Sequence, residues 1–127
     1  MTESARYSIL VEVEPAYLAQ ESDPQEDRYV FSYTVTIHNQ GELPAKLVRR
    51  HWIITDANGE RREISGEGVV GEQPLLGPGE RFRYTSGAML TTPVGSMEGS
   101  YELVGEDGTT FTTPIPAFTL AMPRTLH

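Results

Sequence analysis

The stretch RYVFSYTVTIH, residues 28–38, has the strictest alternation in the chain. Every second position holds a large apolar or aromatic side chain: Tyr29, Phe31, Tyr33, Val35 and Ile37. This alternation is typical of a β-strand with one face in a core and one face towards solvent. Aromatic and β-branched side chains also fit a pleated, half-buried surface. The stretch therefore predicts a strand of an antiparallel sheet.

The same period of two predicts further strands along most of the chain. We expect them at residues 6–14, 46–56, 61–65, 80–86, 96–105, 109–118 and 117–123. Glycine-rich turn signals separate them, among them DANG at 56–59, and residues 66–79 are expected to form a loop. No window of a dozen residues has a helical period, and Pro15 to Leu18 allow a short helical turn at most.

Short strands at this spacing favour an all-β sandwich of seven to eight antiparallel strands, folded as one domain over residues 1–127. Trp52 stands in the third strand, where immunoglobulin-like sandwiches place a core tryptophan. The chain has no cysteine, so the disulfide of true immunoglobulin domains is excluded. A fibronectin type III-like variant of the immunoglobulin-like sandwich is therefore the better prediction.

Composition narrows the classes of function. Without cysteine, thiolate catalysis and cysteine-ligated metal sites are excluded. We see no signal peptide and no apolar run long enough to span a membrane, so we expect a cytoplasmic protein with no membrane partner. The net charge of −8 disfavours nucleic acid as a partner. Half of the ten basic residues lie between positions 46 and 62, which leaves a local anion site open.

The expected loop contains Gly66, Gly68 and Gly71 in the spacing G-x-G-x-x-G, followed by Glu72. In dinucleotide-binding proteins this spacing follows a strand and opens a helix whose N-terminus meets the pyrophosphate. Pro74 and the residues after it prevent such a helix, so a dinucleotide site of that kind is excluded. Two interpretations remain open: a nest of backbone N–H groups that binds an anion, or glycines that serve the loop's geometry.

The tetrapeptide Arg49-Arg50-His51-Trp52 is the second candidate site. On a strand, Arg49 and His51 share one face, and Arg50 shares the other with Trp52. We place Trp52 in the core, so Arg50 is expected at the rim of the core or paired with a carboxylate. Arg49 and His51 are either a binding patch for phosphate or carboxylate or an ordinary solvated face.

Catalytic and metal-binding patterns are missing from the sequence. The histidines are not paired at ligand spacing, no serine lies in a nucleophile elbow, and no two carboxylates are marked for acid–base chemistry. We therefore expect no cofactor, no metal site and no enzymatic activity.

Several blocks of sequence together resemble the ApaG family. They are YVF and YTVTI in the second strand, RRHWIITD at 49–56, the glycine loop through Pro74, PGE at 78–80, YTSG at 84–87 and the ending around Phe118 and Leu120. The resemblance covers the chain from Tyr7 to Pro123. It implies a fibronectin type III-like sandwich in a bacterial protein of unestablished activity, associated in its family with cobalt and magnesium tolerance.

The functional prediction is a non-enzymatic binding module whose partner is a protein. Its expected surface comprises Arg49, Arg50, His51, Gly66, Gly68, Gly71 and Glu72. The alternative is a module that binds a small phosphate-containing anion, pyrophosphate or a nucleotide, through the same residues. A hydrolase of phosphoanhydrides is a third hypothesis, which requires a metal cluster that the sequence does not show.

Overall fold

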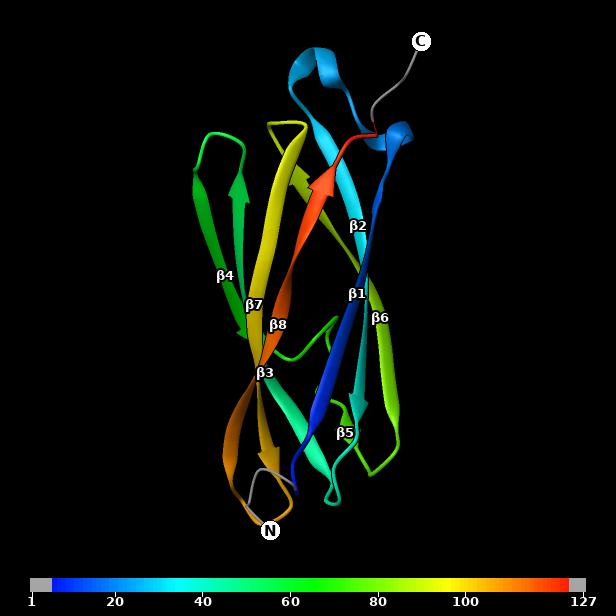
Figure 1. The fold of residues 1–127 in the computed structure, drawn as a ribbon, viewed down its shortest axis with the longest axis vertical. Coiled ribbons are helices and arrows are strands. Elements are labelled where there is room, and N and C mark those ends of the chain that lie inside the picture. Colours follow the sequence, from blue (N-terminus) through cyan, green and yellow to red (C-terminus); the bar gives the residue numbers. More distant parts are fainter. Residues whose placement is uncertain (1–5, 124–127) are drawn as a thin grey trace.

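The computed structural model describes residues 6–123, which form two antiparallel sheets packed face to face (Figure 1). The strands are β1 (Ile9–Tyr17), β2 (Tyr29–Asn39), β3 (Ala45–Asp56), β4 (Arg61–Glu67), β5 (Leu75–Leu76), β6 (Arg81–Leu90), β7 (Val94–Gly105) and β8 (Thr110–Ala121). One sheet has the order β1-β2-β6 and the other β4-β3-β7-β8, with β5 paired to β3. This arrangement confirms the all-β, fibronectin type III-like sandwich.

The core fills the space between the sheets and follows the predicted alternation. In β2, residues from Tyr29 to Asn39 are buried at every second position. Trp52 is 2% exposed and packs with its ring at an angle to those of Tyr33 and Phe118. Such tilted contacts between aromatic rings are favourable beyond the area they bury. The prediction that Trp52 lies in the core is confirmed.

The third strand departs from strict alternation. The register with β7 shifts between Leu47 and Arg49, so the strand carries a bulge at Val48. A bulge inserts one extra residue, and the side chains before it change face relative to those after it. Leu47 is therefore buried on the same side as Trp52, whereas uninterrupted alternation would put it beside Arg49 and His51.

Some expected elements differ in extent. The segment after β1 forms two 3₁₀ turns, η2 (Ala19–Glu21) and η3 (Pro24–Glu26), and Pro15 and Tyr17 belong to the strand itself. The two stretches expected at 109–118 and 117–123 are one strand, β8, in which the register shifts between Ile115 and Phe118. That bulge keeps both apolar runs pointing to the core.

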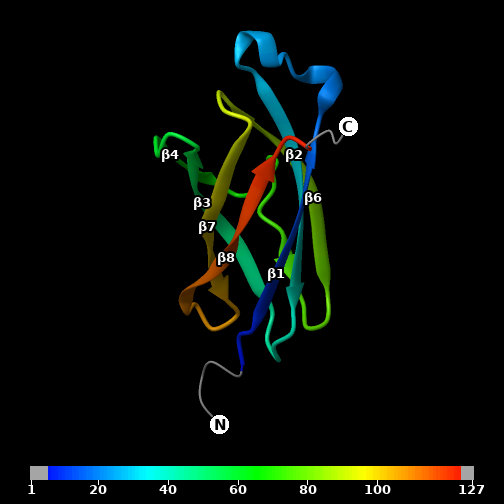
Figure 2. The ribbon, with the colours of Figure 1, turned by 45° about the horizontal axis from the view of Figure 1, so that its top comes forward.

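The sandwich is closed along one side and open along the other. Edge strands β1 and β8 lie against each other and run in the same direction (Figures 1 and 2). The Thr113 hydroxyl on β8 donates a hydrogen bond to the Ile9 carbonyl at 3.3 Å. Edge strands β4 and β6 face the opposite side, which we call the open side, and the loop after β4 lies there between the sheets (Figure 2).

Candidate functional site

Arg50 is fixed by the pairing of β3 with β4. It lies opposite Gly66, on the side of the strand that also carries Trp52. Its Nη1 atom donates hydrogen bonds to the carbonyl oxygens of Glu67 and Gly68, each at 3.0 Å. A Cβ atom at position 66 would lie 2.8 to 2.9 Å from three atoms of the guanidinium group. Glycine is therefore required at this position for the arginine to lie flat against β4.

The bulge in β3 anchors the loop that follows β4. The Val48 carbonyl accepts hydrogen bonds from the Gly68 amide at 2.8 Å and from the Gln73 side chain at 3.1 Å. Gly68 has a φ of 64°, and a Cβ atom there would collide with the Glu72 carbonyl oxygen. Because backbone cannot move aside as a side chain can, the second glycine of the motif is also required by close packing.

The tip of the loop is a tight turn from Val69 to Glu72. The backbone N–H of each of these two residues donates to the carbonyl of the other, at 2.8 and 2.9 Å. Both central residues have positive φ, 42° at Val70 and 81° at Gly71, as in a type I′ turn. Asparagine or glycine normally fills the first central position, so a β-branched residue there is strained. Val70 is also 52% exposed, an apolar side chain held in solvent.

The loop directs carbonyl oxygens, rather than amides, at the arginine. The amides of Gly68, Val69 and Glu72 donate within the protein, and the carbonyls of Glu67 and Gly68 accept from Arg50. An anion at this loop would have to be held by Arg50 itself or by the amides of Val70 and Gly71. The G-x-G-x-x-G spacing is thus explained by loop geometry and by the arginine, and anion binding at the glycines stays a prediction.

A cavity of about 160 Å³ lies between the sheets beneath this turn. Residues of both sheets and of the loop line it: Tyr33, Arg50, Trp52, Val69, Val70, Gly71, Tyr84 and Ser86. Three aromatic residues contribute to its wall, but most of the lining surface is polar, and among the lining residues Arg50 supplies the one formal charge. We call this space the Arg50 cavity.

Arg50 keeps unused hydrogen-bonding capacity. Within residues 6–123, its Nε and Nη2 atoms make no hydrogen bond, and the guanidinium pairs with no carboxylate. The sequence prediction of a rim position is therefore confirmed, but the partners are carbonyl oxygens. A guanidinium presents two parallel donors that match the two oxygens of a carboxylate or phosphate. A half-buried arginine with free donors can bind such a group.

Two buried tyrosines lie beside the cavity and link the sheets. The hydroxyl groups of Tyr84 on β6 and Tyr101 on β7 share a hydrogen bond. Burial raises the pKa of Tyr84 to about 12, and the hydrogen bond and the positive charge of Arg50 oppose that rise. Burial, together with the neighbouring phenols, raises the pKa of Tyr101. Both hydroxyls are therefore neutral at physiological pH and act as hydrogen-bonding groups rather than bases.

Arg49 and His51 lie on the outer face of the β3 sheet, away from the Arg50 cavity. A shallow hollow of about 140 Å³ is lined by Arg49, Arg50, His51, Ser65, Ser100, Glu102 and Thr112, so Arg50 also borders this face. Arg49 is flanked across the sheet by Glu67 and Glu102. The His51 Nε2 atom lies 3.7 Å from a carboxylate oxygen of Glu63. This face alternates charges of both signs, as solvated sheet surfaces do.

The structure thus divides the predicted surface into two parts. Arg50, Gly66, Gly68 and Gly71 come together at the open side, and Glu72 is exposed at the rim of the same loop. Arg49 and His51 stand on a different face, in a hollow that Arg50 also borders. The sequence analysis did not single out the cavity residues Tyr33, Tyr84 and Ser86. Alternation in the sequence indicates that these side chains point towards the core. It does not indicate which strands of the two sheets face each other.

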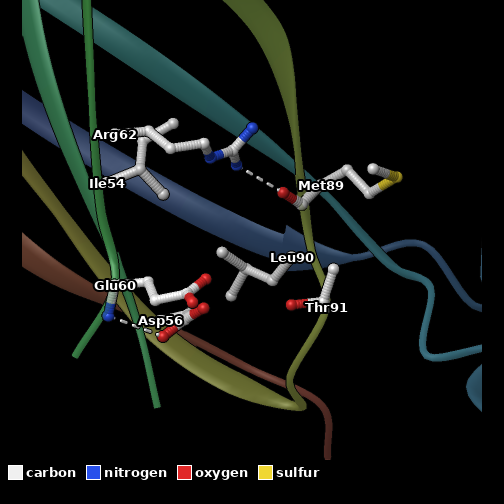
Figure 3. A pocket seen from close by; sticks show the side chains of 7 residues that line it. All are labelled: Ile54, Asp56, Glu60, Arg62, Met89, Leu90 and Thr91. Atoms are coloured by element: carbon white, nitrogen blue, oxygen red, sulfur yellow. Dashed lines mark hydrogen bonds between the residues drawn. The ribbon is translucent and has the colours of Figure 1, made fainter. Parts of the chain in front are cut away.

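A second hollow of about 150 Å³ lies further along the open side (Figure 3). Its lining residues are Ile54, Asp56, Glu60, Arg62, Met89, Leu90 and Thr91. Arg62 reaches from β4 across the gap, and its Nη2 atom donates to the Met89 carbonyl on β6 at 2.7 Å (Figure 3). Asp56 accepts from the backbone amides of Asn58 and Glu60 and so shapes the β3–β4 turn. The Arg62 bridge ties the two free edges at one end of the open side.

Residues 6–123 contain neither a cluster of metal ligands nor a membrane-spanning helix. No group of three or more histidine, aspartate or glutamate side chains in this range is arranged to hold a metal ion. No helix in this range has the length and apolar character needed to cross a membrane.

The fold and the site define a class: a fibronectin type III-like sandwich with an arginine-centred cavity on its open side. Residues 19–105 match the ApaG domain family, and the chain belongs to that family. The chain is 60% identical to Protein ApaG of Thiobacillus denitrificans and 57% identical to Protein ApaG of Dechloromonas aromatica, over all 127 residues and the full length of each relative.

Solved structures agree with the family assignment. A crystal structure of an ApaA protein from Bordetella pertussis superposes with a TM-score of 0.91 at 55% identity, covering 94% of this chain and 97% of that chain. The family predicted from the sequence blocks is confirmed. The names of these relatives state no catalytic activity, and the activity of this chain is a matter for proposal.

Proposed function

We propose that the protein is a non-enzymatic binding module whose contact surface is the open side of the sandwich. One observation carries the proposal. Arg50 lies half-buried at the Arg50 cavity with two unused donor atoms, between two sheet edges that leave backbone free for a partner. Unpaired edges and a lined pocket are the features by which sheet proteins recognise extended segments. The proposed partner is therefore a protein.

The same proposal extends to cellular context. The net charge of −8 favours a protein over nucleic acid or an anionic membrane as partner. We place the module in the bacterial cytoplasm, in keeping with a chain that carries no cysteine. The family is associated with cobalt and magnesium tolerance, and we propose that the protein contributes to this tolerance through the partner that it binds.

Site-directed photo-cross-linking in cells tests the binding surface. A photo-reactive amino acid in place of Glu72, exposed beside the Arg50 cavity, is expected to give discrete cross-linked products. The same amino acid in place of Ala117, exposed on β8 away from the open side, is the matched control. Products from position 72 should disappear with Arg50→Gln and persist with Arg49→Gln. Identical products from both positions would contradict the proposed surface.

The absence of turnover is tested separately with purified protein. We expect no hydrolysis of ATP, pyrophosphate or diadenosine tetraphosphate above the protein-free rate, with Mg²⁺ or with Co²⁺. If metal-dependent turnover is found and Arg50→Gln abolishes it, the protein is a hydrolase and the proposal of a non-enzymatic binding module is wrong.

A second candidate function, binding of a small phosphate-containing anion, is favoured by the free donors of Arg50. The amides of residues 66–71 and the side chain of Arg50 should then shift in NMR spectra as pyrophosphate or ATP is added, with Mg²⁺ or Co²⁺ next. Shifts at Arg49 and His51 without shifts at Arg50 would place the anion on the outer face instead.

A further inference from the structure

We infer that the ligand at the Arg50 cavity is a carboxylate side chain, Asp or Glu, on an extended segment of a partner protein that adds to the free edge of β6. The inference rests on the proposed function and names the chemistry of the group that this surface accepts.

The first argument is the chemistry of Arg50. Its two unused donors, Nε and Nη2, form one edge of a planar guanidinium, and Nη1 is already committed to two carbonyl oxygens. A single such edge matches one carboxylate in a two-point contact. A phosphate dianion or a nucleotide usually meets several cations or a row of amides. This loop has committed three of its amides to protein carbonyls.

The second argument is the size and the lining of the cavity. Its volume of about 160 Å³ is below the range of roughly 300–1,000 Å³ that is typical of cavities for whole small ligands. Most of the lining surface is polar, with Arg50 as its one charged side chain, so the cavity accepts an anionic group better than an apolar one. The cavity therefore suits one acidic side chain of a longer ligand.

The third argument is the position of β6. This strand pairs with β2 on one side, and its other edge faces the open side. Two of its residues, Tyr84 and Ser86, line the cavity. Side chains of a strand alternate between the two faces of a sheet. A segment that extends the sheet at β6 therefore points every second side chain towards the space between the sheets, where Arg50 lies.

The fourth argument is the strained turn at the mouth of the cavity. Val70 adopts a φ of 42°, which asparagine or glycine would adopt at lower cost, and it exposes half of its surface. Strain of this kind concentrates at functional sites. An apolar side chain held there offers the incoming segment a contact next to the acidic side chain. The net charge of −8 disfavours a segment rich in acids, so we expect a single acidic residue among uncharged ones.

The test uses NMR titration of the whole protein with three probes. They are the peptide acetyl-Thr-Val-Glu-Val-Thr-amide, the same peptide with glutamine in place of glutamate, and inorganic phosphate. We expect the glutamate peptide to shift the amides of residues 84–88 and the side-chain Nε–H of Arg50 in a saturable way. The glutamine peptide lacks the charge-assisted contact, so its affinity for the protein should be lower by about tenfold or more.

Variants locate the contact. Arg50→Gln should abolish the preference for glutamate over glutamine, and Arg49→Gln, on the other face, should leave it unchanged. Arg50→Lys keeps the charge without the two-point geometry and should lose part of the preference. If Arg50→Gln does not fold, the preference measured for Arg50→Lys shows whether Arg50 makes the contact.

Three outcomes would overturn the inference. They are equal affinity for the two peptides, an unchanged preference in the Arg50 variants, and phosphate that produces the same shifts and displaces the glutamate peptide. If the peptides fail but cross-linking from position 72 still depends on Arg50, the open side remains the binding surface and only the class of ligand is wrong. If cross-linking fails as well, the proposed function falls with the inference.

Discussion

Gly66 shows how a single missing side chain organises this site. The guanidinium group of Arg50 occupies the space where a Cβ atom at position 66 would stand. The arginine in turn holds the carbonyls of Glu67 and Gly68 and so fixes the start of the loop. Of the three glycines, Gly66 is thus explained by the arginine across the strand pair, and Gly68 and Gly71 by the backbone geometry of the loop.

We expect Gly66→Ala to displace Arg50 and to lower the free energy of unfolding by about 1–3 kcal/mol, the usual worth of hydrogen bonds to a charged group. Chemical denaturation measures the change. In an Arg50→Gln background the same alanine should cost much less, because no guanidinium fills the space. An equal cost in both backgrounds would show that the strand pairing, and not the arginine, requires the glycine.

At Val70, in contrast to Gly66, a substitution is expected to stabilise the protein. Val70→Asn should raise the free energy of unfolding by about 1 kcal/mol, because asparagine tolerates positive φ better than a β-branched residue. Gly71→Ala, in the same turn at a φ of 81°, is the control and should destabilise. Thermal or urea unfolding distinguishes the two. If Val70→Asn is neutral or destabilising, the turn does not store strain at that residue.

At the scale of elements, the start of β1 is tied to the hairpin between β7 and β8. Tyr7 stacks on Phe111 with ring centroids 4.9 Å apart, and its hydroxyl donates to Asp107 at 2.6 Å. The Asp107 carboxylate also accepts from the Thr109 amide at 3.0 Å. The hydrogen bonds from Tyr7 and then from Thr109 lower the pKa of Asp107 to about 2.

This tie predicts sensitivity to acid. A carboxyl group with a lowered pKa in the folded state stabilises the fold above its ordinary pKa near 4, and that contribution is lost as the pH falls towards 2. Urea unfolding midpoints of the wild type should therefore drop between pH 4 and pH 2. Tyr7→Phe keeps the ring stacking and should flatten the drop, whereas Glu26→Gln, on an exposed 3₁₀ turn, should not. If Tyr7→Phe leaves the drop in the unfolding midpoint unchanged, the drop comes from carboxyl groups other than that of Asp107.

Elements were the most predictable level of the structure. Alternation located β2 almost to the residue, because one face is buried along its whole length. Uninterrupted alternation would place Leu47 with Arg49 and His51, but the bulge at Val48, which has no signal in local composition, turns it into the core. Alternation left out the two-residue strand β5, which is too short to show a period.

The candidate site was predictable only in part. The glycines and Arg50 were visible as unusual residues, and the prolines after Gly71 correctly excluded a nucleotide-binding helix. Arg49 and His51 were joined to them because they are neighbours in sequence, although adjacent strand residues face opposite ways. Tyr84 and Ser86 reach the cavity from the other sheet, a relation that depends on how the sheets pack.

At the scale of the whole molecule, the hydrogen bond between Tyr84 and Tyr101 joins the two sheets through the core. Both phenols have a raised pKa because burial disfavours the phenolate. Groups of this kind stabilise the fold below their ordinary pKa near 10, and that contribution is lost as the pH rises towards 12. The protein should therefore lose stability in alkali.

The expected loss of stability between pH 10 and pH 12 is about 3 kcal/mol from the shift in the pKa of Tyr84 alone. Denaturation at several pH values measures it. A double variant, Tyr84→Phe with Tyr101→Phe, should lose stability less steeply over this range, and Tyr17→Phe, away from the pair, is the control. Parallel curves for the double variant and the wild type would contradict the assignment.

The direction of β1 and β8 has a mechanical consequence. The chain enters β1 at one end of the long axis and leaves β8 at the other (Figure 1). Tension applied through these two strands acts along them, and their interstrand hydrogen bonds lie perpendicular to the pull. Those bonds are loaded together in shear instead of being peeled apart singly. Force applied along the length of the module would therefore load the β1–β2 and β7–β8 hydrogen bonds together.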